Sequence, residues 1–274
     1  MVRESVFRQC AFRLSERAGK RRLDSFDIER AVFDAMTMRE PFDKVKPVYD
    51  AELMQKEPDY AGLLDSMKFN GTHRTDFGGM HWGVTYGVHS KPREKVGERK
   101  VTYKSYFTFR PRSGTPEGRF EEIRNFVRLL PRLHEELRPL QEQHSAGIAM
   151  KIPGDLLTLL RHPDSLVVHY SDPELAGEIE ATVQRLAQEQ GVNFDRFPTR
   201  AHRGFDFEVP TEHASASSSH SELVSRAVAK RFMAEYDKLE GKPEGELAAW
   251  LMQKVKLASS WTPQQMHDYL YGRK

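Results

Sequence analysis

Lys151 is the residue whose position is most suggestive of chemistry. It stands near the end of the apolar run 147–153, which has the composition of a buried β-strand. Apolar surroundings and neighbouring cations lower the pKa of a lysine, and a lysine that acts as a general base needs a lowered pKa. Lys151 is therefore a candidate base, while an ordinary charge at the edge of a sheet explains it equally well.

Further cations stand on or beside predicted strands. They are Lys104, Arg110, Arg161, His162 and His169. Arg110 follows Phe109 at the end of a strand, where its planar guanidinium could bind a phosphate or a carboxylate or could form a local salt bridge. Tyr106 shares the more polar face of the same strand with Lys104 and Thr108. That face is the one we expect to bear a site.

The familiar catalytic motifs are missing from the chain. It has no phosphate-binding Gly-x-x-x-x-Gly-Lys, no Gly-x-Ser-x-Gly, no His-Glu-x-x-His and no dinucleotide-binding glycine pattern. His81 and His89 are eight residues apart and His213 and His220 seven apart, which are not metal-ligand spacings. The single cysteine, Cys10, excludes an internal disulfide and a cysteine-based zinc site. These absences weaken nucleotide-dependent and zinc-hydrolase functions, and we do not expect a metal site.

Composition and charge narrow the class of protein. The 274 residues contain 42 Lys and Arg against 40 Asp and Glu, and a net charge of +2 makes no case for nucleic acid. The mean hydropathy is −0.66, and no apolar run approaches the roughly 18 residues of a membrane span. The charged first residues do not resemble a secretory signal. We therefore expect a soluble, cytoplasmic protein that binds neither nucleic acid nor membrane.

The first 70 residues read as polar helices. Apolar positions at Phe7, Phe12 and Leu14 mark one helix, and Ser25 is the expected N-cap of the next. The cations between these helices read as a solvated linker: Arg17, Lys20, Arg21 and Arg22. A short helix is expected to follow Pro58 and to end near residues 70–71.

The middle of the chain alternates strands and helices. Residues 81–90 and 101–109 predict a long hairpin, joined by the charged segment 91–100. Residues 118–143 predict an amphipathic helix that Pro131 and Pro139 should kink or end. Two strands around 148–152 and 165–170, a helix over 172–189 and a strand at 205–209 follow. This order indicates an α+β fold with a mixed, mainly antiparallel sheet that helices cover on one face.

The last third of the chain is expected to be helical. The serine-rich stretch 211–221 reads as a linker or a lid, and helices are predicted over 221–236, 243–258 and 263–271. These elements divide the chain into a helical N-terminal segment (1–75), an α+β core domain (76–240) and C-terminal helices (241–274).

Several landmarks occur in a fixed order between about residues 81 and 235. They are the strand 104–111, Lys151 near the end of its strand, the segment 164–170, and residues 225–227 after the serine-rich loop. In these landmarks the chain resembles the HopA-type effector family. That family comprises type III secreted effectors of a plant pathogen and stand-alone proteins of bacterial peptide-modification clusters, class V lanthipeptide biosynthesis among them.

The resemblance implies a phosphoserine/phosphothreonine lyase that removes phosphate from a peptide or protein by β-elimination and leaves a dehydroamino acid, without a cofactor. The expected catalytic residues are Lys151 as the base and Tyr106 or His169 as the acid. The expected phosphate-binding or substrate-binding residues are Lys104, Arg110, Arg161, His162 and Arg226. The implied partners are a phosphorylated precursor peptide or a phosphoprotein, with a kinase or a secretion chaperone beside it.

The chain also departs from the family's pattern. Where members carry Arg two residues before the Asp of the second strand, this chain has His162, and where they carry Tyr five residues after that Asp, it has His169. The alternative function is a secreted effector that binds a phosphorylated or acidic host protein without catalysis. A chain that reads as helical from residue 2 favours the bacterial cytoplasm over secretion into a host cell.

Overall fold

The computed structural model divides the chain into two compact units. It describes residues 2–37, 53, 55–66, 73–77, 80–87, 94–144, 147–161, 164–195, 203–208 and 217–272. The first compact unit comprises Met1–Arg39, Lys95–Val101 and Pro198–Lys274, and we call it the helical unit. The second is the sheet unit, which comprises Glu40–Glu94 and Thr102–Phe197.

The sheet unit is built on antiparallel strands in the order β1-β2-β5-β6-β4. Their bounds are β1 His73–Phe77, β2 Met80–Gly87, β4 Arg99–Phe109, β5 Ile148–Ile152 and β6 Leu166–Tyr170. The short strand β7, Phe194–Asp195, pairs with the end of β4. The predicted hairpin of residues 81–90 with 101–109 is wrong, because β5 and β6 lie between β2 and β4.

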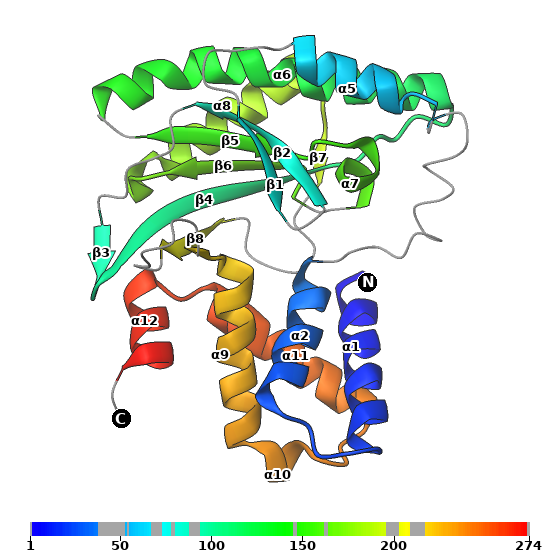
Figure 1. Ribbon diagram of the computed structural model, residues 1–274, viewed down its shortest axis with the longest axis vertical. Coiled ribbons are helices and arrows are strands. Elements are labelled where there is room, and N and C mark those ends of the chain that lie inside the picture. The colour runs from blue at the N-terminus through cyan, green and yellow to red at the C-terminus, as the bar shows by residue number, and fades with distance from the viewer. Residues whose placement is uncertain are drawn as a thin grey trace. The chain divides into compact units, whose positions relative to one another are not determined.

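Three helices cover one face of this sheet (Figure 1). They are α5 Glu57–Ser66, α6 Pro116–Gln143 and α8 Ala176–Glu189. The apolar stripe of α6 packs into one buried cluster with alternate residues of β4, β5 and β6. An α+β fold with an antiparallel sheet under helices is therefore confirmed.

Helix α6 continues through both of its prolines. It spans 28 residues, so the expectation that Pro131 or Pro139 ends the helix is wrong. A proline inside a helix costs about 3 kcal/mol. The helix buries several apolar side chains of its stripe completely, Ile123, Phe126 and Leu130 among them, and this burial offsets the cost. Its first turn is capped by Thr115, whose side chain accepts from the Gly118 N–H at 3.1 Å.

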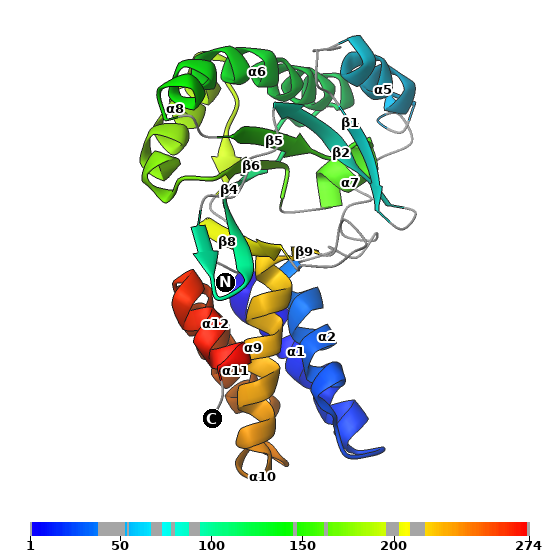
Figure 2. The same cartoon turned by 60° about the vertical axis from the view of Figure 1, so that its left-hand side comes forward.

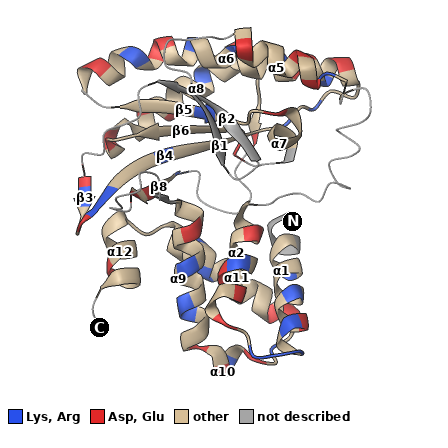
Figure 3. Cartoon of the chain, in the orientation of Figure 1, with Lys and Arg blue, Asp and Glu red and all other residues tan. Residues whose placement is uncertain are grey.

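The outward sides of α6 and α8 carry both signs of charge, which Figure 3 shows for α6. Arg132 lies 2.7 Å from Glu189, and Arg185 lies 3.1 Å from Glu136, so the two helices are joined by ion pairs. These pairs are exposed and contribute little stability each. Each pair neutralises one charge on α6 and one on α8.

The helical unit is assembled from segments far apart in the sequence (Figure 2). Its helices are α1 Val2–Ala18, α2 Ser25–Thr37, α9 His220–Ala234, α10 Tyr236–Leu239, α11 Glu244–Ser259 and α12 Pro263–Tyr271. Helix α1 packs on α11, and α2 packs on α9. The strands β8 Arg203–Glu208 and β9 Ser217–Ser218 pair with each other. The three helices predicted in the last third of the chain are confirmed.

Two details of the first helices differ from expectation. Asp24, not Ser25, caps α2, because its carboxylate accepts from the Asp27 N–H at 2.9 Å and its own N–H donates to Asp27 at 3.1 Å. Phe12, expected on the apolar side of α1, is 47% exposed, whereas Phe7 and Leu14 are buried. The expected stop of the helix after Pro58, at residues 70–71, lies outside the described residues.

The basic segment between α1 and α2 is more than a solvated linker. Arg21 and Arg17 lie 2.8 and 3.4 Å from the carboxylate of Asp27, which is buried. Burial alone would raise the pKa of Asp27, but the Asp24 backbone N–H and the Arg21 guanidinium outweigh it and hold that pKa below its usual range. The cations therefore stabilise a buried anion that fixes the start of α2.

The short elements complete the two units. Strand β3, Glu94–Val96, turns tightly into β4 at Gly97, whose φ of 59° lies in the left-handed region that favours glycine. Helix α7, Leu156–Arg161, joins β5 to β6, and the 3-10 turn Pro173–Leu175 leads into α8. In the described ranges, no helix has both the length and the apolar character that a membrane crossing needs.

Candidate functional site

Strand β4 has a core side and an opposite side. Phe107 and Phe109 join the large apolar cluster beneath the helices. Tyr106 points the other way and forms a separate small cluster with Val167 of β6. Because side chains alternate along a strand, Lys104 and Thr108 lie on the same side as Tyr106. The polar side expected from the sequence is therefore the side that α5, α6 and α8 do not cover.

The register of the strands places four of the expected site residues on this opposite side. Lys104 of β4 is directly across from His169 of β6, which is across from Ala149 of β5. Tyr106 is across from Val167, which is across from Lys151. We call these two parallel rows the polar face, and their polar members are Lys104, Tyr106, His169 and Lys151.

The rows also fix how far apart these residues lie. Directly opposite residues in an antiparallel pair have Cβ atoms about 5 Å apart, and diagonal neighbours about 7–8 Å. Lys104 and His169 are directly opposite, and Lys151 is diagonal to His169. Tyr106 and Lys151 are separated by one strand, or about 10 Å. Val167 of β6 occupies the position between them.

Burial sets the electrostatics of the polar face. Lys104 is 6% exposed and Tyr106 is 3% exposed, whereas Lys151 and His169 are half-buried. The Lys104 ammonium lies 5.4 Å from the centre of the Tyr106 ring, within the range of a cation–π contact. A cation removed from water interacts more strongly with an anion than one at the surface. The polar face thus combines a buried cation with more accessible groups.

The core side of the same strands holds them in register through polar contacts. Ser105 lies 3.1 Å from the Tyr170 hydroxyl and donates to Glu180 of α8 at 3.0 Å. Tyr103 stacks on Tyr170 and donates a hydrogen bond to Glu94. Burial, and then this bond, raise the pKa of Tyr103 well above its ordinary value, so it stays a neutral donor. These contacts position Lys104 and Tyr106 on the other side.

Arg110 has a local role at the end of β4. Its guanidinium donates to the Leu160 carbonyl at 3.2 Å, near the carboxyl end of α7. Ser165 donates to the Phe109 carbonyl at 3.1 Å and ties the start of β6 to the same place. Arg110 follows Phe109 and is half-buried, and this bond uses one of its five N–H donors. It lies at the end of β4 and outside the two rows.

The remaining expected residues do not belong to the two rows. Arg161 ends α7, and its side chain lies outside the described part, as does the whole of His162. Arg226 belongs to the helical unit, where it lies 3.1 Å from Glu29. Burial lowers the pKa of Arg226, but the bond to Glu29 outweighs it and raises that pKa. Arg226 therefore joins α9 to α2 as a permanent cation.

Two members of the rows were missed from the sequence, Val167 and Ala149. Val167 lies between Tyr106 and Lys151, whereas Ala149 ends its row beside His169, and both side chains are buried. The alternation of strand residues, applied to 166–170, would have placed Val167 beside His169. Their partners across the sheet could not be derived, because strand order follows from the whole fold.

In the described ranges, no three His, Cys, Asp or Glu side chains lie close enough together to bind a metal ion. Neither a protein-family model nor a curated protein matches this chain.

Proposed function

We propose that the protein is a phosphoserine/phosphothreonine lyase of the HopA type, and that the polar face of the sheet unit is its active site. The observation that carries the proposal is the pair of rows that brings Lys104, His169, Tyr106 and Lys151 onto one face of three adjacent strands. These are the residue types that a β-elimination of phosphate requires: a base, a cation for the leaving phosphate and a proton donor.

Each residue has one task in the proposed reaction. Lys151 takes the Cα proton, the electron pair of that C–H bond forms the Cα–Cβ double bond, and the Cβ–O bond breaks. The phosphate leaves with the electrons of the Cβ–O bond. Lys104 binds the phosphate, and Tyr106 or His169 donates a proton to its departing oxygen. The dehydroamino acid and phosphate are the only products, and the reaction as written uses no oxidant and no metal.

Lys104 suits the role of the anion site better than the exposed cations do. It is almost wholly buried beside the Tyr106 ring, so its attraction to phosphate is weakly screened by solvent. Lys95, by contrast, is exposed on β3. A substrate phosphate that reaches Lys104 would lie next to His169, the residue directly opposite.

The test is elimination from a phosphothreonine peptide, followed by mass spectrometry for the loss of phosphoric acid. The native protein is expected to release phosphate, and Lys151→Ala to reduce the rate at least a hundredfold, because a general base contributes about 10²–10⁴ in rate. Lys95→Ala is the matched control and should keep full activity. Undiminished elimination by Lys151→Ala would overturn the proposal.

Binding measurements separate a lyase from a protein that only binds. Both require affinity for a phosphorylated peptide, so fluorescence anisotropy with Lys151→Ala should show binding without turnover. If the native protein binds the phosphopeptide and releases no phosphate over hours, the non-catalytic effector function replaces the lyase. If neither occurs with phosphoserine or phosphothreonine peptides, both functions are ruled out for those peptides.

A further inference from the structure

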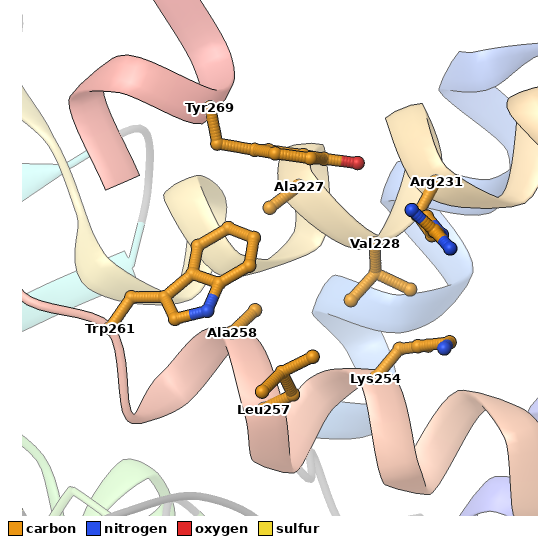
Figure 4. A pocket seen from close by; sticks show the side chains of 8 residues that line it. All are labelled: Ala227, Val228, Arg231, Lys254, Leu257, Ala258, Trp261 and Tyr269. Carbon is orange, nitrogen blue, oxygen red and sulfur yellow. The ribbon is translucent and has the colours of Figure 1, made fainter. Parts of the chain in front are cut away.

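A small cavity lies within the helical unit, and all of its lining residues belong to that unit. Its volume is about 150 Å³. Its walls come from α9, α11, α12 and the turn before α12, as Figure 4 shows. The main lining side chains are Ala227, Arg231, Lys254, Ala258, Trp261 and Tyr269.

The cavity has an aromatic end and a charged end (Figure 4). The Trp261 indole closes one end, and its ring centre lies 4.8 Å from that of Tyr269 with the planes 56° apart. Arg231 and Lys254 stand at the other end, toward which the Tyr269 hydroxyl points. Ala258 and Ala227 keep the floor small and apolar. A ligand that fills this space must be apolar at one end and polar at the other.

The charged end carries one uncompensated positive charge. Arg231 is paired with Glu235, which also accepts from the Trp250 indole N–H at 3.3 Å. Burial would raise the pKa of Glu235, but the hydrogen bonds from Arg231 and Trp250, and then the charges of Arg231 and Lys254, outweigh it and lower that pKa. Glu235 is therefore an anion near two cations, and the three charges sum to +1. Among the described residues Lys254 forms no ion pair, and its ammonium lies 5.4 Å from the Trp250 ring centre. The charged end of the cavity therefore favours a ligand group that carries a single negative charge.

We infer that this cavity binds a small aromatic monocarboxylate, with its ring against Trp261 and Tyr269 and its carboxylate at Lys254. A cavity of about 150 Å³ is large enough for a benzene ring. Offset or edge-on contact with the two aromatic rings favours a planar ligand over a branched one. The half-exposed Leu257 at the rim leaves an apolar path from solvent. The inference is independent of the proposed lyase activity, which concerns the other unit.

The probes are benzoate and its neutral analogue benzamide, titrated into the full-length protein and followed by the NMR signal of the Trp261 indole N–H. Benzoate is expected to shift that signal with a Kd in the millimolar range or below, and benzamide to bind at least fivefold more weakly. Equal binding of the two probes, or an unshifted Trp261 signal at saturating benzoate, would overturn the inference. A Trp261→Phe variant assigns the signal.

Two variants locate the charge and the space. Lys254→Gln should weaken benzoate at least fivefold and leave benzamide unchanged, whereas Lys256→Gln, on the same helix but exposed and outside the cavity, should change neither. Ala258→Leu fills the cavity and should abolish both. If Ala258→Leu fails to fold, Leu257→Gln at the exposed rim tests the apolar wall instead. Unchanged benzoate affinity in Lys254→Gln would contradict the assignment.

Discussion

Lys104 and His169 lie directly opposite each other on β4 and β6. Both are on the polar face, the side of the sheet away from the large apolar cluster that packs beneath α5, α6 and α8. One is almost wholly buried and the other half-buried. Two groups that can both carry a positive charge at a directly paired position destabilise a sheet unless an anion lies near them. In the proposed active site, the substrate phosphate is the anion beside this pair.

Replacing Lys104 with Met should remove that anion site while keeping most of the side-chain volume. In a Lys151→Ala background, which prevents turnover, we expect the affinity for a phosphothreonine peptide to fall about tenfold or more, because a charged hydrogen bond is worth about 1.5–3 kcal/mol. Fluorescence anisotropy measures the affinity, and a thermal melt verifies the fold. Lys95→Met is the control, and equal affinities of the two variants would contradict the assignment.

The ion pair of Arg226 with Glu29 predicts a charge-swap result. Arg226→Glu or Glu29→Arg alone should destabilise the protein by about 1 kcal/mol or less, because both side chains are partly exposed, and the double swap should recover most of that loss. Urea denaturation measures the free energies. If the double swap restores stability but not elimination activity, Arg226 also binds the substrate. If it restores both, the role of Arg226 is purely structural.

Asp27 predicts how the stability of the helical unit depends on pH. Its pKa is lowered in the folded protein, so it contributes stability above its unfolded pKa of about 3.9, and that contribution is lost as the pH falls through the lower folded value. Asp27→Asn should therefore lower the free energy of unfolding at pH 7. As the pH is lowered from about 4 to about 2, the free energy of unfolding of this variant should fall less than that of the native protein. Urea titrations at several pH values test this against Asp237→Asn, an almost fully exposed control.

Cys10 predicts that thiol labelling will report the opening of α1. Burial raises the pKa of its thiol to about 12, and the side chain is 4% exposed. Since the thiolate is the reactive form, a thiol reagent at pH 8 should label the folded protein very slowly and the urea-unfolded protein fully. Mass spectrometry counts the label, and Cys10→Ala gives the background. Rapid labelling of the folded protein would show that α1 opens readily.

Gly97 should be more sensitive to substitution than another glycine with the same backbone conformation. A Cβ at Gly97 would lie 2.8 Å from Nε2 of His267, whereas at Gly241, whose φ is also positive, no atom lies within 4 Å. Gly241→Ala should cost about 1 kcal/mol for the left-handed conformation alone. Gly97→Ala should cost more, because His267 must also move. Urea denaturation compares the two, and equal losses would show that His267 moves freely.

The local features of this fold were readable in the sequence, and the pairings between distant segments were not. The spacing of Ile123, Phe126 and Leu130 predicted α6, and Thr262 with Pro263 predicted the start of α12, where Thr262 and Gln265 form a capping box. The alternation along β4 predicted which side Lys104 and Tyr106 occupy. These signals involve neighbours a few residues apart.

What the sequence could not supply was strand order. Residues 81–90 and 101–109 have strand composition, but composition does not state which strand pairs with which, and β5 and β6 separate them. The rows that join Lys104 to His169 and Tyr106 to Lys151 depend on that order. Likewise, nothing local shows that Glu29 and Arg226, 197 residues apart, form a pair. These relationships arise only when the whole chain has folded.

The assembly of the helical unit from distant segments has a consequence for synthesis. The buried Phe7 and Leu14 of α1 belong to a helix that packs on α11, which begins only at Glu244. At about 5–20 residues per second, a ribosome needs roughly 10–50 s to make the chain between them. All the strands of the sheet unit are complete by Asp195, well before α11 emerges. A nascent chain would thus expose the apolar side of α1 while the sheet forms.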